Sequence, residues 1–502
     1  MPELVARHQI ILTTKHGRLR TGCITIQPHT ATATLPLARR LRPWFLCSFF
    51  TSCTLAVFLT AISTASAANV YIRSQATGAN NGTDWINAYT SIPSPMIRGN
   101  TYYLAAGTYG SYTFSVPISG STLITLKKAT AADHGTHTGW SSTYGDGLAT
   151  FSSASITVNT GYFVIDGATG GGPGSWKIGH GIVFTSPAGT SIEYINVASG
   201  VSHLVVRRVH FTQAGNTETT TARANGIYNN NILNNSLFEY NYFDNLGGLP
   251  FFLRNGSGNI FQYNYLGNIC GMSVADPNQH CEGIVIWGMT DVHFRWNYVS
   301  KSPSSGGFVK NSFLTADAIR IYGNVIANGF PINCNHGSCT KWIIFNNTFH
   351  TGSSGPVGGD GTMSGSYFYN NIMFNFSFMA PMWGIHDYNW LSRSSGLRCR
   401  MGAATHENIC SGCSGGCDSL TMTTDPFVNA SGSTPEDFRL TKAIREHDGD
   451  NVCQLDGCTG ENKYNIDAFG LIRGADGVWD RGAYEYSSRR RPSPSTRGPI
   501  RH

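Results

Sequence analysis

The most regular feature of the sequence is a short phrase of apolar and aromatic residues around an asparagine, which returns between Asn235 and Asn371. FEYNYF, FRWNYV and IFNNTF are examples. The intervals are 23, 33, 27, 23 and 24 residues, and the asparagines lie at Asn241, Asn264, Asn297, Asn324, Asn347 and Asn371. Repeats of this length with a strand-like core predict a solenoid of stacked β-coils and argue against a helical array.

We interpret each phrase as one strand of a coil, with its asparagine at the bend where the strand turns a corner. Asparagine tolerates a left-handed backbone conformation, and asparagines stacked in successive coils can hydrogen-bond to one another. Chance recurrence in a chain rich in Gly and Asn is the alternative, and it is disfavoured because the copies share a spacing.

A second set of short apolar runs lies between the asparagine phrases and advances by about one coil at a time. These runs start at Asn225, Pro250, Glu282, Gly307, Phe330 and Pro356. Each coil therefore contains at least two strands, and strands that stack coil on coil pair in parallel.

The two ends of the chain body also carry recognisable segments. VYIRSQATGANNGTDWINAYTSIP with GNTYYLAAGTYG opens it, from Val70 to Gly110, and WDRGAYEY closes it, from Trp479 to Tyr486. Together with the repeats, these segments resemble the right-handed parallel β-helix superfamily, which includes pectate lyase-like proteins and secreted bacterial β-helix repeat proteins. The resemblance covers nearly all of the chain after Ala67. It implies an all-β fold, a right-handed parallel β-helix with N- and C-terminal caps, and it is not specific for an activity.

The pattern divides the chain into five segments. The regular coils lie in the centre, a Cys-rich segment without a period follows them, and the Pro-, Ser- and Arg-rich tail is expected to be disordered. The predicted boundaries are 1–67 for the leader and signal peptide, 68–200 for the N-terminal cap and first coils, 201–380 for the regular β-helix coils, 381–486 for Cys-rich loops and a C-terminal cap over the open end of the solenoid, and 487–502 for the tail.

The formal charge of +6 comes from the two ends of the chain. Residues 1–67 hold seven Lys or Arg, and residues 487–502 hold five Arg. The body between them has five more acidic than basic residues, so we expect no nucleic-acid partner.

The N-terminal region has the pattern of a secretory signal. Arg39, Arg40 and Arg42 precede an apolar run from Trp44 to Ile62, and small residues follow at 65–67. We therefore expect cleavage after Ala67, a secreted or cell-surface protein, and no membrane contact after cleavage. An uncleaved anchor is the alternative, because the apolar run is close to the length that spans a membrane.

Ten cysteines follow the leader, and an even number in an oxidising compartment predicts disulfides. Proximity in sequence suggests, without establishing, the pairs Cys270 with Cys281, Cys334 with Cys339, Cys399 with Cys410, Cys413 with Cys417 and Cys453 with Cys458. A zinc site built from four of these cysteines and His406 is less favoured, because secretion favours disulfides.

Candidate chemistry lies on the second set of strands. Alternate side chains of a strand face outward, and stacking of coils turns them into a column on the surface. We expect this column to contain Tyr228, Arg254, Trp287, Lys310, Asn335 or His336, and Asp360, with His280 and Glu282 added by a preceding loop. Aromatic faces can stack on sugar rings, and Arg or Lys can hold uronate carboxylates. The column predicts a groove for an acidic polysaccharide, and exposed polar positions without a function are the alternative.

The resemblance adds a mechanism. Polysaccharide lyases of this fold use Lys, Arg or His to remove the proton beside a uronate carboxyl group, with cations or calcium neutralising its charge. On that comparison Lys310, Arg254 and His280 are the candidate catalytic residues, Glu282 is a further candidate, and calcium is the only cofactor suggested. The sequence carries none of the diagnostic lyase motifs and no cluster of closely spaced Asp residues.

Two other classes of protein stay open. A non-catalytic adhesion or matrix protein, with the solenoid as a rigid spacer, is favoured by the missing motifs and the sparse acidic residues. A glycoside hydrolase needs two suitably spaced carboxylates, and Glu282 with Asp360 is the pair to test. The residues do not indicate an oligomeric state.

Overall fold

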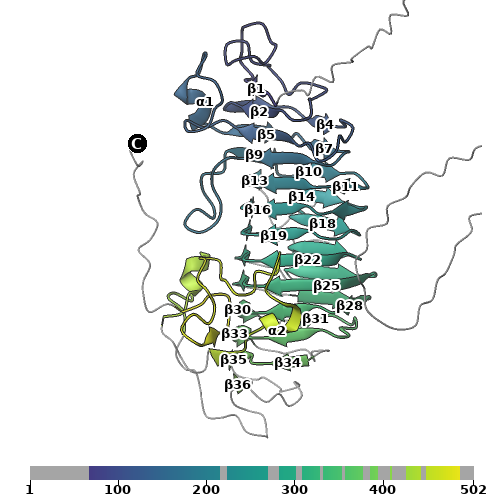
Figure 1. Cartoon of the computed structure of the whole chain (residues 1–502), viewed down its shortest axis with the longest axis vertical. Helices are drawn as coiled ribbons and strands as arrows, with labels where there is room; N and C mark the ends of the chain where they lie inside the picture. Colours follow the sequence, from purple (N-terminus) through teal and green to yellow (C-terminus); the bar gives the residue numbers. More distant parts are fainter. Residues whose placement is uncertain are drawn as a thin grey trace, which may run out of the picture. The chain divides into compact units, whose positions relative to one another are not determined.

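The computed structural model describes residues 67–214, 223–268, 282–300, 308–327, 332–352, 357–376, 385–393, 408–409, 426–441 and 448–486. They belong to one compact unit, Thr64–His502, and the other unit, Met1–Ser63, lies outside the described residues. Most described elements are β-strands, and they form three long sheets (Figure 1). A coil passes through sheets A, B and C in turn, so the chain has three strands per coil where the sequence predicted at least two.

Sheet A is the longest, and its strands pair in parallel throughout. Its strands are β1 Asn69–Ile72, β2 Thr101–Leu104, β5 Ile124–Lys128, β8 Phe163–Asp166, β12 Leu204–Arg207, β16 Leu237–Glu239, β19 Ile260–Gln262, β22 Thr290–Arg295, β25 Thr315–Tyr322, β29 Ile343–Phe345, β32 Tyr367–Tyr369 and β34 Ile385–Asp387, and β28 Ser338–Thr340 also pairs with β25.

Sheet B follows sheet A across a sharp corner in most coils and is also parallel. Its strands are β3 Gly107–Tyr109, β6 Ala149–Ser152, β9 Ile182–Pro187, β13 Val209–Ala214, β17 Tyr242–Asp244, β20 Tyr265–Leu266, β23 Tyr298–Val299, β26 Val325–Ile326, β30 Thr348–Gly352, β33 Ile372–Phe376, β35 Trp390–Arg393 and β36 Asn408–Ile409.

Sheet C contains the second set of strands that the sequence predicted, and it too is parallel. Its strands are β4 Tyr112–Phe114, β7 Ile156–Val158, β10 Ile192–Val197, β14 Ala224–Asn229, β18 Phe251–Arg254, β21 Ile284–Trp287, β24 Val309–Ser312, β27 Ile332–Asn335 and β31 Val357–Gly358. All six predicted runs correspond to strands, β14 to β31, and the fold is the right-handed parallel β-helix that the sequence predicted.

The remaining described elements are short. They are the parallel pair β11 Val201–Ser202 and β15 Leu233–Asn234, the antiparallel pair β37 Asp448–Gly449 and β38 Trp479–Asp480, the helices α1 Ser142–Asp146 and α2 Cys453–Asp456, and the 3-10 helix η1 Pro435–Phe438. Within the described ranges, no helix is both long and apolar enough to cross a membrane.

The asparagine phrase contains two strands and not one, which corrects the sequence interpretation. In FEYNYF, β16 ends at Glu239 and β17 begins at Tyr242, so the asparagine lies in the corner between sheets A and B. The left-handed residue is also not the asparagine but the residue before it, as in Tyr240 with φ of 58° and Trp296 with φ of 58°.

The corner asparagines form a buried ladder along the coils. Asn241 Nδ2 donates to Asn264 Oδ1 at 3.0 Å and to the Val206 carbonyl of the preceding coil at 2.9 Å. The same side chain-to-side chain bond continues through Asn297, Asn324, Asn347, Asn371 and Asn389. Each ladder asparagine is at most 2% exposed, so these bonds satisfy polar groups that would otherwise be costly in the core.

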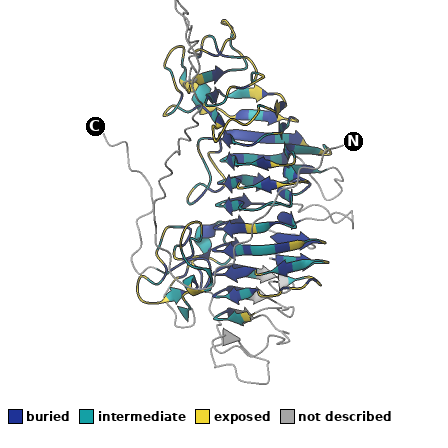
Figure 2. Ribbon diagram, turned by 45° about the vertical axis from the view of Figure 1, so that its right-hand side comes forward, coloured by how far each residue is buried: buried dark blue, intermediate teal, exposed yellow. Residues whose placement is uncertain are grey.

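Apolar side chains fill the interior between the three sheets (Figure 2). Rings stack from coil to coil, with centroid distances of 4.6, 5.4 and 4.8 Å along Phe151, Phe184, Phe211 and Phe243. Stacking in register is what an identical residue at each repeat produces in a parallel solenoid. The sheets therefore have outer faces whose positions are fixed by a continuous core.

Described residues of the C-terminal segment pack against the coils (Figure 1). Much of the range 381–486 lies outside the described residues, so the cap over the open end stays a prediction. Residues 426–441 pack on sheet B, where Phe438 contacts Tyr298. Residues 448–486 pack on sheet A, where Tyr464 contacts Tyr322. Of the three sheets, A and B are thus partly covered by residues from the end of the chain.

Candidate functional site

The outward side chains of sheet C form two columns, not the single column that the sequence predicted. One column contains Tyr228, Phe252, Val285, Lys310 and Asn333 in register. The other contains Arg254 beside Trp287, and Ser312 beside Asn335. A strand alternates its side chains between its two faces, so residues two apart, such as Lys310 and Ser312, both face outward.

Aromatic rings run along this face from coil to coil. Tyr228 stacks on Phe252 with centroids 4.9 Å apart, and Phe252 meets the edge of Trp287 at 5.1 Å. Phe313, just after β24, contacts Trp287 at 5.7 Å and His336 at 5.5 Å. The sequence prediction included three of these rings and missed Phe252 and Phe313. All five rings are half-buried or exposed, so the face presents a strip of aromatic surface.

Arg254 supplies positive charge beside this strip. Its guanidinium lies over the Trp287 ring, 5.9 Å from the centroid, and Nη1 donates to Asn230 Oδ1 at 3.4 Å. Arg254 Nε and Trp287 Nε1 are buried and have no hydrogen-bond partner among the described residues, so they are not available to a ligand. The terminal guanidinium nitrogens of an arginine in this position can donate to a carboxylate, so this pair can recognise an acidic sugar.

Lys310 and Glu282, two of the candidate catalytic residues, lie in contact. Lys310 Nζ donates to Glu282 Oε1 at 2.6 Å, and the two side chains are 8% and 2% exposed. A buried ion pair is held in place by strong hydrogen bonding, and either charge alone would be costly. The low exposure of Lys310 makes it a poorer direct contact for a polymer than Arg254.

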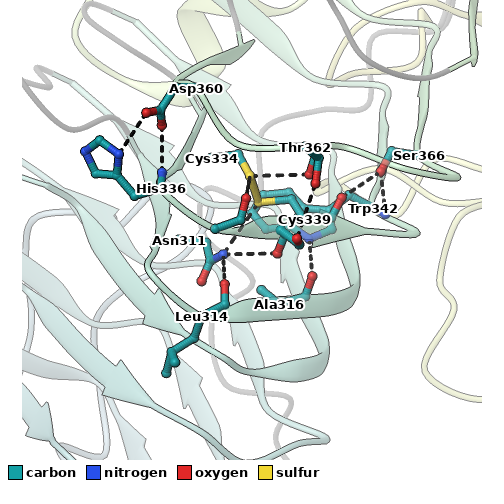
Figure 3. The surroundings of a disulfide bond; sticks show 12 residues. Asn311, Leu314, Ala316, Cys334, His336, Cys339, Trp342, Asp360, Thr362 and Ser366 are labelled. Atoms are coloured by element: carbon teal, nitrogen blue, oxygen red, sulfur yellow. Dashed lines mark hydrogen bonds and ion pairs between the residues drawn. A yellow bond between two sulfur atoms is a disulfide. The ribbon is translucent and has the colours of Figure 1, made fainter.

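Asp360 and His336 form a separate pair at the other end of the face (Figure 3). Asp360 Oδ1 accepts from the His336 backbone N–H at 2.7 Å, and Oδ2 lies 2.8 Å from Nδ1. These contacts, the backbone N–H first, lower the pKa of the Asp360 carboxyl, so it is an anion at neutral pH. Asn335, the last residue of β27, directly precedes His336 and faces outward.

The proposed hydrolase pair is contradicted by this arrangement. Glu282 precedes β21, whereas Asp360 follows β31, three strands further along sheet C and at the opposite strand ends. Three strand spacings alone amount to about 14 Å, which exceeds the ~10 Å limit for paired catalytic carboxylates. Each carboxylate also has its own partner, Lys310 for Glu282 and His336 for Asp360.

Two of the predicted disulfides are confirmed. Cys334 pairs with Cys339 and Cys453 pairs with Cys458. The first joins the end of β27 to β28 across the turn that carries His336 (Figure 3). His280 and the other cysteines of the predicted pairs, Cys270, Cys281, Cys399, Cys410, Cys413 and Cys417, lie outside the described residues.

The described residues offer calcium no suitable ligand set. No group of three or more His, Cys, Asp or Glu side chains that could hold a metal lies together in the ranges given above. Calcium takes about six to eight oxygen ligands, and Glu282 and Asp360 lie three strands apart along sheet C.

Sheet B also carries a column of rings, but part of this column is covered by other residues. It consists of His210, Tyr242, Tyr265 and Tyr298 in register. Tyr265 and Tyr298 are only 3% and 1% exposed, and the Tyr265 hydroxyl donates to the Ser433 carbonyl at 2.9 Å. Burial lowers the pKa of His210 to about 4, so this imidazole is neutral at neutral pH. Sheet C carries rings and an arginine that are half-buried or exposed.

The fold and this face define a right-handed parallel β-helix with an aromatic and cationic outer strip. No protein-family model matches the sequence, and no curated protein sequence is significantly similar to it. Among solved structures, the chain is similar to pectate lyase Pel9A, with 16% identity, a TM-score of 0.46, and coverage of 84% of this chain and 97% of that one.

Two further solved structures are similar at lower levels. A rhamnogalacturonan lyase has 11% identity and a TM-score of 0.36, over 68% of this chain and 87% of that one. The PL6 family alginate lyase AlyGC has 12% identity and a TM-score of 0.39, over 68% of this chain and 52% of that one. These likenesses do not bear on activity, and the fold assignment rests on the strand pairing described above.

Proposed function

We propose that the protein is secreted and binds an acidic polysaccharide along the outer face of sheet C. The observation that carries this proposal is the Arg254 guanidinium lying over Trp287 within a strip of rings that continues over successive coils. Rings offer apolar faces to sugars, and arginine offers paired donors to a uronate carboxylate. The secretory leader pattern and the two disulfides support an extracellular location.

Binding is favoured over cleavage by the contacts and burial of Lys310, the lysine on this face among the described residues. A lysine that abstracts a proton must be neutral and must reach the substrate. Lys310 is instead engaged by Glu282 and is 8% exposed. Cleavage by β-elimination, with Lys310 beside Glu282 as the base, is the second candidate. An adhesion or matrix role would use the same binding face and would not involve cleavage of the polysaccharide.

The test is retention of the mature chain, from Ala68 onward, in gels that contain pectin, alginate or a glycosaminoglycan, with neutral dextran as a control. Arg254→Ala is expected to weaken retention about 5- to 10-fold, since a charged hydrogen bond is lost. Lys341→Ala removes the same charge from an exposed turn away from sheet C and is expected to leave retention unchanged. Retention that is equal for all three proteins would overturn the proposal.

The same polymers decide between binding and cleavage. Incubation with each polymer, followed by ultraviolet absorbance of unsaturated uronates, detects β-elimination directly. The proposal predicts retention without a rise in absorbance. A rise that Lys310→Ala abolishes would establish the second candidate and make Lys310 the base.

A further inference from the structure

Four successive turns after the strands of sheet C begin with a residue in the left-handed backbone region. The residues are Asn255, Gly288, Phe313 and His336, with φ of 57°, 67°, 64° and 52°. Each follows the last residue of its strand directly, so the four positions are equivalent along the coils. Glycine and asparagine are favoured in this conformation, whereas a phenylalanine there is an outlier.

Burial of the side chain does not offset the cost of this backbone conformation at Phe313. Its side chain is 63% exposed, and it is the only phenylalanine among the exposed large apolar side chains of the described residues. An exposed ring gains little from the hydrophobic effect, and this backbone conformation is costly for it. Folding alone therefore does not account for phenylalanine at a position that asparagine occupies two coils earlier.

The surroundings of Phe313 hold its ring in a defined place. Trp287 packs against it at an interplanar angle of 86°, and His336 lies nearly parallel to it at 24°. His336 is fixed in turn by Asp360 and by the Cys334–Cys339 disulfide across its own turn. Figure 3 shows the disulfide together with the contact between His336 and Asp360.

We infer that Phe313 is a stacking residue for an uncharged sugar unit of the bound polysaccharide. This inference rests on the proposed function and adds a second kind of subsite to it. The Arg254 end of sheet C fits a carboxylate, whereas the Phe313 end carries the Asp360 carboxylate, which is 58% exposed. A uronate would be repelled there, while sugar hydroxyls can donate to the carboxylate. The ligand is thus an acidic polysaccharide that also contains uncharged sugars.

The test compares hyaluronate, in which acidic and uncharged sugars alternate, with polygalacturonate, in which the sugars are acidic. Phe313→Asn is expected to weaken retention by hyaluronate about 5- to 10-fold, and by polygalacturonate less than about twofold. Phe313→Tyr keeps the ring and is expected to behave like the wild type. Arg254→Ala is expected to weaken retention by both polymers.

Thermal unfolding separates a binding role from a structural one. Because asparagine relieves the backbone conformation, the Tm of Phe313→Asn is expected within about 2 °C of the wild type or above it. A clearly lower Tm, unchanged retention by hyaluronate, or an equal loss on both polymers would each overturn the inference. Retention of the wild type by neither polymer would also overturn it, whereas retention by another acidic polymer would leave the proposed function standing.

Discussion

At the scale of single residues, each corner asparagine forms hydrogen bonds with polar atoms of neighbouring coils. Asn297 Nδ2 donates to Phe261 O at 2.9 Å and to Asn324 Oδ1 at 3.0 Å, and Asn297 Oδ1 accepts from both nitrogens of Asn264 at 3.0 Å. A buried polar group left unpaired costs about 1–3 kcal/mol. One side chain therefore stabilises its own coil and the coils on both sides.

Replacing a ladder asparagine should destabilise the whole solenoid. Asn297→Ala is expected to lower the free energy of unfolding by about 2–4 kcal/mol, because polar groups of two neighbouring coils lose a partner. Urea denaturation followed by circular dichroism measures the change. Asn231→Ala, at an exposed position, is the control and should change it by less than about 0.5 kcal/mol. Equal stability of the two variants would contradict this role of the ladder.

The ladder could be predicted from the sequence only in part. Its asparagines are visible because one residue type repeats at one position. The left-handed residue before each asparagine is Tyr240, Tyr263 or Trp296 in three of the coils, and these types give no sign of that conformation. Phe313 was missed for the same reason, since a turn position of this kind is expected to hold glycine or asparagine.

At the scale of elements, the strands of sheet C were predictable but their columns were not. Each apolar run in the sequence became a strand from β14 to β31. The run Ile284–Trp287 is apolar at every position, so alternation does not show which face is inward. Only pairing with neighbouring coils reveals that Lys310 lies in the column of Tyr228 and that Trp287 lies in the column of Arg254.

The last element, residues 448–486, is held by buried carboxyls around Arg473. Arg473 Nη1 lies 3.6 Å from Glu485 Oε2, and Asp467 accepts hydrogen bonds from three backbone N–H groups. Burial raises the pKa of Asp480 to about 6 and that of Glu485 to about 7. The folded segment therefore binds protons more tightly than the unfolded chain between pH 4 and pH 7.

This cluster predicts a pH effect on stability. A raised carboxyl pKa makes the stabilising contribution of Glu485 largest below its unfolded pKa, and the contribution is lost as the pH rises through about 7. Glu485→Gln cannot titrate. The Tm of the wild type minus the Tm of Glu485→Gln should therefore decrease when the pH is raised from about 5 to about 8. An increase of this difference over the same range would show that burial does not set the pKa of Glu485.

At the scale of the whole described body, the three sheets have different outer faces. Residues 426–441 cover part of sheet B, and residues 448–486 cover later strands of sheet A. Sheet C keeps its rings and Arg254 accessible over several coils. Because the coils stack in register, a strip on one sheet forms a line along the solenoid, and a line of sites suits an extended polymer.

Hydrogen–deuterium exchange of the mature protein, with and without the polymer that retains it, tests the central claim most directly. The account predicts slower exchange on binding in the turns of sheet C, at residues 255–258, 288–289, 313–314 and 336–337. Exchange in sheets A and B should be unchanged. Slower exchange confined to sheet A or sheet B, with the turns of sheet C unaffected, would contradict the assignment of sheet C as the binding face.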